Sequence, residues 1–208
     1  IDPPVMNFTK AFLKYKYNQT TLIAGQKPLN LDTQRFVGSV GWRQMPQTFG
    51  LFSIKQQINS KFSVLGVLLY RRDGIKPELN KQYRRGSAIL HTNYEHSNPL
   101  KLTGYAYFLE AIHSTYGANI KGEVETTPLT LTYRAEYALQ SDPLIDDTTA
   151  IDIDTNYYNI EVGAKVNNFF TKVGYEVFGD AGSGLTGFST PYATGHKFNG
   201  WSDVLLSE

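Results

Sequence analysis

The chain has 208 residues, of which 41% are hydrophobic and 13% aromatic; it has no cysteine and a formal net charge of +1. This length allows one domain with a sizeable core. The near-neutral charge gives no reason to expect a nucleic acid as partner, and the lack of cysteine excludes disulfides and thiol chemistry. No run approaches the roughly 18 apolar residues of a spanning helix, so a helical membrane protein is excluded.

Apolar and polar residues alternate along most of the chain, a period of two that predicts β-strands. In 129–140, Leu131 and Tyr133 share one face, whereas Arg134 and Glu136 share the other. In chain order we expect about ten strands, near 8–17, 20–27, 48–58, 61–71, 86–95, 99–110, 116–125, 129–140, 157–166 and 169–178. Most are roughly 9–12 residues long, which suits tilted membrane-spanning strands better than the shorter strands of soluble sandwiches.

The connections between these strands alternate between short and long. Tight turns are expected at 18–19, 59–60, 96–98, 126–128 and 167–168, and longer links at 28–47, 72–85, 111–115, 141–156 and after 179. Outer-membrane barrels alternate in this way because their periplasmic turns are short and their external loops long. The sequence therefore predicts an all-β fold, a transmembrane antiparallel up-and-down β-barrel in the bacterial outer membrane, with 1–208 as a single domain.

Two features refine this prediction. Aromatic residues gather toward strand ends, as in the interfacial girdles of barrels, although aromatics favour strands of any kind. The segment 62–69 is apolar on both faces near its end, so either an inward-folded loop covers it or its register differs. The 28–47 link is long enough to hold a further short strand.

Two segments resemble the alginate-export family of outer-membrane proteins. The first comprises 24–29, Asp32, 35–38, Trp42, Arg43, Gln44 and 47–49, and the second is 188–203, centred on His196, Lys197, Phe198, Gly200 and Asp203. The resemblance implies a single-chain barrel of about 18 strands, within the range of such barrels. Its best-known members pass alginate outward through an arginine-lined, anion-selective lumen. Because this chain supplies only about ten strands and ends in a loop, we expect it to be part of a larger barrel.

In a channel the working residues point inward. Alternation places on one polar face the cations Lys10, Lys14, Lys16, Lys121, Arg134, Lys165 and Lys172 together with the acids Glu123, Glu125, Glu136, Glu161 and Glu176. From this modestly cationic mixture we expect weak anion preference, in a pore lined by Lys14, Lys16, Lys121, Arg134, Glu136, Lys165 and Lys172. The alternative is that these charges only pair with one another across neighbouring strands.

The family-like segments add further candidates. By resemblance, Arg35, Arg43 and Gln44 lie near the constriction, where guanidinium groups would hold the carboxylates of uronates or other organic acids. Alternatively, Arg43 anchors its own loop to a carboxylate of the barrel wall. His196, Lys197 and Asp203 are expected in a loop that enters the lumen or caps its mouth.

No cofactor, metal site or catalytic residue is expected. The histidines lack metal-ligand spacing and a convincing catalytic partner. A calcium site is conceivable in an acidic external loop without EF-hand spacing, although such loops are more often simply solvated; its members are Asp142, Asp146, Asp147, Asp152 and Asp154.

The leading hypothesis is an outer-membrane channel or porin, surrounded by lipid, that passes polar and anionic solutes; the resemblance suggests an acidic saccharide such as alginate or a uronate. The alternative is a non-transporting surface protein whose loops bind a partner. An outer-membrane enzyme and a soluble lipocalin-like binder have less support.

Overall fold

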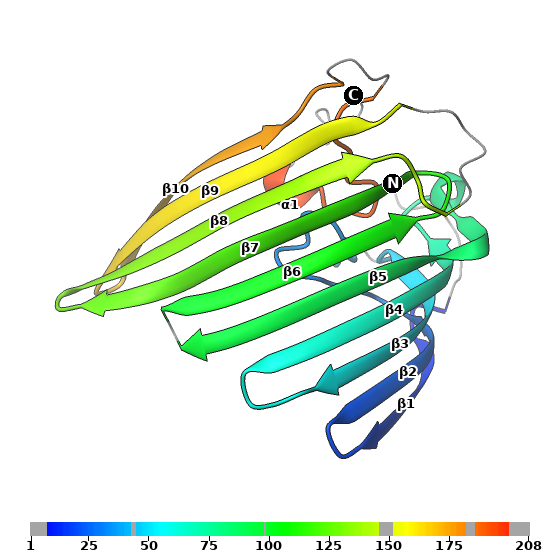
Figure 1. Cartoon of the computed structure of the whole chain (residues 1–208), viewed down its shortest axis with the longest axis horizontal. Helices are drawn as coiled ribbons and strands as arrows, with labels where there is room; N and C mark the ends of the chain where they lie inside the picture. Colours follow the sequence, from blue (N-terminus) through cyan, green and yellow to red (C-terminus); the bar gives the residue numbers. More distant parts are fainter. Residues whose placement is uncertain (1–7, 43–44, 98, 146–151, 182–185, 200–208) are drawn as a thin grey trace.

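In the computed structural model, residues 8–42, 45–97, 99–145, 152–181 and 186–199 are described. They form one antiparallel sheet of ten strands arranged in chain order, each hydrogen-bonded to the next (Figure 1). The strands are β1 (Ala11–Tyr17), β2 (Thr20–Lys27), β3 (Thr48–Gln57), β4 (Phe62–Asp73), β5 (Lys81–Ser97), β6 (Leu100–Leu109), β7 (His113–Thr126), β8 (Leu129–Ser141), β9 (Asp154–Val166) and β10 (Phe169–Phe178). Two short helices accompany them, η1 (Pro77–Leu79) and α1 (His196–Asn199).

The expected rhythm of connections is confirmed. The turns after β1, β3, β5, β7 and β9 lie at one end of the strands, which we call the turn end (Figure 1). The longer links lie at the opposite end, the loop end. Asn18 and Asn167 have φ angles of 49° and 52° in their turns. Asparagine tolerates this left-handed region better than most residues, which explains its use in two-residue hairpins.

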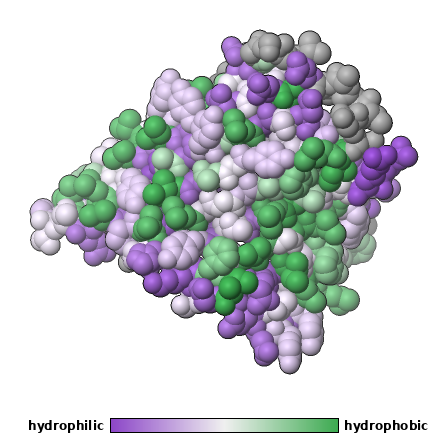
Figure 2. Space-filling view, viewed as in Figure 1, coloured by the Kyte–Doolittle hydropathy of each residue, from purple (hydrophilic) through white to green (hydrophobic). Residues whose placement is uncertain are grey.

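The two faces of the sheet are chemically different. On β8, β9 and β10 the outward side chains of Leu131, Val162 and Val173 are 39%, 55% and 75% exposed, whereas the inward Arg134 and Glu136 are buried. In Figure 2 apolar side chains (green) form several patches on the face seen, with hydrophilic ones (purple) between and around them. A surface that exposes apolar residues and buries charged ones fits hydrocarbon outside, and it confirms the predicted fold class of an outer-membrane β-barrel.

Two loop segments fold against the concave inner face. The first inward segment is 28–47, without 43–44, and the second is 186–199; an isolated parallel bridge joins Val37 to Tyr192. A core of buried apolar residues fills the space between these segments and the sheet. Its members on β4, Val67 and Leu69, explain why 62–69 is apolar on both faces, so the inward-folded loop was the correct alternative. The described part of 28–47 contains only that bridge and no further strand.

Three strands begin earlier than the alternation predicts, so their loops are shorter. β5 begins at Lys81 instead of residue 86, β7 at His113 instead of 116, and β9 at Asp154 instead of 157. In β5 a register shift opposite Leu69 and Arg71, together with Gly86 at a φ of 86°, interrupts the alternation that marks a strand. No helix among the described residues is long and apolar enough to cross a membrane.

Candidate functional site

Arg35 anchors the first inward segment, which follows β2, to β10, the last strand of the sheet. Its Nε and Nη2 donate hydrogen bonds of 2.9 and 2.7 Å to the two carboxylate oxygens of Glu176 on β10. The guanidinium carbon lies 4.4 Å from the ring centre of Phe178 and 4.7 Å from that of Phe198. Tyr157 also donates to Glu176, at 2.7 Å. A two-point ion pair held between two rings is a strong and directional anchor.

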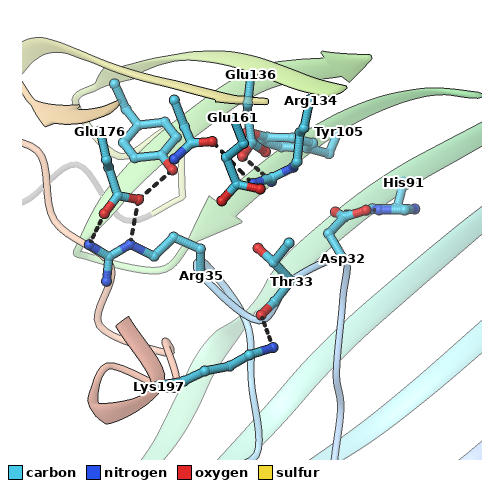
Figure 3. A network of polar contacts seen from close by, with 12 residues as sticks. Asp32, Thr33, Arg35, His91, Tyr105, Arg134, Glu136, Glu161, Glu176 and Lys197 are labelled. Atoms are coloured by element: carbon cyan, nitrogen blue, oxygen red, sulfur yellow. Dashed lines mark hydrogen bonds and ion pairs between the residues drawn. The ribbon is translucent and has the colours of Figure 1, made fainter. Parts of the chain in front are cut away.

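The tip of this segment makes further polar contacts. Asp32 lies 2.8 Å from Nε2 of His91 on β5, and Lys197 of the second inward segment donates to the backbone oxygen of Thr33 at 3.2 Å (Figure 3). Asp32 and Gln34 adopt positive φ angles of 48° and 70°. Such conformations are costly for residues other than glycine, so the surrounding contacts must hold the tip in shape.

Buried amide side chains fix the second inward segment in its place. Gln47 Nε2 donates to the backbone oxygens of Gly38 and Tyr192, at 2.7 and 3.0 Å, and therefore joins the two segments. Gln140 on β8 donates from Nε2 to the Ser189 oxygen at 2.7 Å and accepts from its N–H at 2.9 Å. Gly38 and Tyr192 are buried, so their backbone oxygens need a hydrogen-bond partner within the protein. Together the two glutamines specify where the segment lies.

The inner wall of β8 to β10 pairs many of its charges internally. Arg134 forms an ion pair with Glu136, which also accepts a hydrogen bond of 2.9 Å from Tyr105. Lys172 lies 3.1 Å from Glu161. Of these two ion pairs only Lys172–Glu161 joins neighbouring strands, because Arg134 and Glu136 lie two residues apart on β8. Pairing between inward charges, the alternative to pore lining, therefore accounts for part of this wall.

The opposite wall, on β1 to β3, has a different character. Residues 8–31 and 45–72 contain no aspartate or glutamate. The inner face there carries a lysine column that runs from the loop end to the turn end and consists of Lys10, Lys14, Lys16, Lys27 and Lys55. Among the described residues no carboxylate forms an ion pair with any of the five.

The predicted site residues are distributed as follows. All seven expected pore residues lie on the inner face by register; Lys14, Lys16, Lys121, Lys165 and Lys172 are exposed there, whereas Arg134 and Glu136 are buried. Arg35 contacts a carboxylate of the protein itself, and Lys197 contacts the first inward segment. Outside the described residues lie Arg43, Gln44, Asp203, Asp146 and Asp147, and the side chain of His196 is likewise not described. No group of three metal-ligating side chains occurs in the described part of the chain.

Sequence reasoning missed the residues that position the inward segments. Glu176, Gln47 and Gln140 carry this task, but each is an ordinary polar residue at an inward position. Glu176 was placed on the polar face without a partner, because nothing in the sequence links β10 to a loop 141 positions earlier. The acid-free stretch that produces the lysine column was visible in the sequence and could have been found by charge patterning.

Several solved structures of outer-membrane proteins are similar in fold. They include Acinetobacter baumannii OccAB4 (19% identity, TM-score 0.67, covering 79% of this chain and 43% of that one) and a BenF-like porin from Pseudomonas fluorescens Pf-5 (15%, 0.71, 81% and 46%). Pseudomonas aeruginosa OpdK, solved with vanillate, is a third (14%, 0.63, 78% and 45%). At such low identity the likeness shows the fold, that of bacterial outer-membrane porin barrels. This chain spans less than half the length of these three proteins.

The other two comparisons gave no match. No protein-family model matches the sequence, and no curated protein matches it. The resemblance to the alginate-export family therefore gains no support from these searches, whereas a porin-like barrel is supported by structural likeness.

Proposed function

We propose that this protein is part of an outer-membrane channel that passes small polar solutes and favours anions, and that it is not an enzyme. The lysine column is the observation that carries the proposal. Its lysines line one wall and form no ion pair with a carboxylate that the structure describes, and Lys14, Lys16 and Lys55 are exposed on the inner face. Unpaired cations along a pore wall attract anions and repel cations, which biases permeation.

The inward segments support a channel with a narrowed lumen. They occupy the concave face at the loop end, whereas Lys14, Lys16 and Lys55 of the lysine column stay exposed. The solved neighbours support passage of small solutes, because OpdK has been crystallised with vanillate, an aromatic carboxylate. An alginate- or uronate-like cargo is a narrower proposal that rests only on the two family-like segments and on the same lysines.

The test is the reversal potential of the full-length protein in planar bilayers under a KCl gradient. We expect chloride to be favoured over potassium, and the double variant Lys14→Gln/Lys16→Gln to reduce that preference. The control Lys61→Gln/Lys76→Gln removes the same charge outside the lysine column and should leave the preference intact. A barrel without conductance would instead favour the surface protein whose loops bind a partner, and cation preference would refute the anionic part of the proposal.

A further inference from the structure

Three positively charged side chains lie directly beside one another near the turn end of the inner wall. Lys101 on β6 is the register partner of Lys121 on β7, which is in turn the partner of Arg134 on β8. Like charges that face each other across strands destabilise a sheet. Lys121 therefore has a cation on each side, and the fold gains nothing from this arrangement by itself.

The neighbouring groups neutralise only part of this charge. Arg134 is occupied by Glu136 and also donates to Asn159 at 3.4 Å. Glu161, the register partner of Arg134, is occupied by Lys172. Lys101, Lys121 and Glu123, by contrast, form no ion pair with any other residue that the structure describes.

These three unpaired groups line one pocket of about 420 Å³, together with Thr132 and the paired Arg134, Glu161 and Lys172. Lys121 and Glu123 are exposed and Lys101 is partly so. Directly opposite residues have Cβ atoms about 5 Å apart, and alternate residues on one strand lie about 7 Å apart. The pocket thus offers two ammonium groups and one carboxylate within the reach of a single small molecule.

We propose that this pocket binds an acidic amino acid, a solute with two carboxylates and one ammonium group. The inference rests on the proposed channel function and names the solute class for one site along the inner wall. The carboxylates would be held by Lys101 and Lys121, and the ammonium group by Glu123. A plain dicarboxylate would use the same lysines but place its negative charge beside an unpaired carboxylate, which disfavours it.

Glutamate and glutarate separate these two cases, because they differ only by the α-ammonium group. The readout is the Kd of each for the full-length protein, from concentration-dependent block of chloride current and, independently of conduction, from isothermal titration calorimetry in detergent. We expect glutamate to bind about 1.4- to fivefold more tightly, the range given by the 0.2–1 kcal/mol of a solvent-exposed ion pair.

Each variant has a matched control on the same inner face. Glu123→Gln should abolish the preference for glutamate, whereas Glu125→Gln, two residues further along β7 and outside the pocket lining, should retain it. Lys121→Gln should weaken both ligands by a similar factor, whereas Lys165→Gln should not. All four positions are exposed, so the variants are expected to fold.

The outcomes also separate this site from the channel proposal. Equal or tighter binding of glutarate, or a preference for glutamate that survives Glu123→Gln, overturns the site even in an anion-selective channel. A barrel without current that still binds glutamate through Glu123 refutes the channel and supports the site.

Discussion

Replacing Arg35 by glutamine should release the first inward segment from the wall of the barrel. The wild-type side chain makes two hydrogen bonds with Glu176. The side chain of Arg35 is 7% exposed and that of Glu176 is 26% exposed. Removing one partner of a buried ion pair costs roughly 3–5 kcal/mol. Because Glu176 is one-quarter exposed and can be partly hydrated, we expect the lower end, about 3 kcal/mol.

That energy sets the size of the effect on conduction. A change of about 3 kcal/mol alters an equilibrium about a hundredfold. We therefore expect that the fraction of time spent in a wider, higher-conductance substate rises about a hundredfold in Arg35→Gln. Single-channel recording of the full-length protein measures this fraction directly.

Arg71→Gln is the matched control. Arg71 also pairs with a carboxylate, that of Asp73 at 2.7 Å, but both residues lie on β4, so the pair holds no inward segment. If Arg35→Gln shows the same substates as the wild type and as Arg71→Gln, then Arg35 does not hold the segment, and the reasoning from burial and geometry is refuted.

Three further predictions concern the fold. Glu110 accepts hydrogen bonds from the N–H groups of Arg84, Arg85 and Gly86 at 2.9, 2.8 and 2.7 Å; burial alone would raise its pKa, but these donors and Lys81 outweigh it and lower the pKa below the ordinary 4.5. Glu110→Gln should therefore lower the free energy of unfolding by about 2 kcal/mol at neutral pH. Melting curves recorded at several pH values should show the full difference above pH 4.5 and its loss as the pH falls through the lowered pKa of Glu110. Phe36→Ala removes a ring whose centre lies 5.2–6.0 Å from the centres of four other aromatic rings, and it should lower the free energy of unfolding by about 3–5 kcal/mol. An unchanged melting temperature would show that the inward segments add no stability. Val162→Arg places a charge on the outward face and should cost about 2–4 kcal/mol in lipid, whereas Thr132→Arg on the inward face of the neighbouring strand should cost much less; equal costs in urea unfolding would contradict the assignment of the faces.

The strands could be predicted from the sequence because one physical rule acts on every residue of a barrel wall. Leu131, Val162 and Val173 face outward, and the residues between them face a polar interior, so a period of two is written along each strand. The rule fails where both faces meet protein. Around Leu69 the inward segments give the strand an apolar partner on its inner face as well. At the start of β5 the register shift interrupts the alternation, and the predicted start of this strand was therefore five residues too late.

The inner site was only partly predictable, for a different reason. Alternation assigns a side chain to a face but gives no distance between strands far apart in the chain. It therefore placed Glu136 and Glu176 on the inner face, yet it could not show that the first pairs with Arg134 two residues away and the second with Arg35 of a distant loop. The suggestion that an arginine anchors its own loop to a wall carboxylate was made for Arg43, and the structure shows this contact for Arg35.

The distribution of the carboxylates gives the two walls different roles. Glu176 is committed to Arg35 and Gln140 to Ser189, so the wall of β8 to β10 holds the inward segments and uses its polar groups for that purpose. In the described part of the chain no carboxylate pairs with the lysines of β1 to β3, and five cations on one face would repel one another without any gain in stability. Such a cost is understandable where the missing counter-charge arrives with the solute. An anion passing between the inward segments and the lysine column would supply this counter-charge at each step. The wall of β8 to β10 would then narrow the pore by holding the inward segments, and the wall of β1 to β3 would attract the solute.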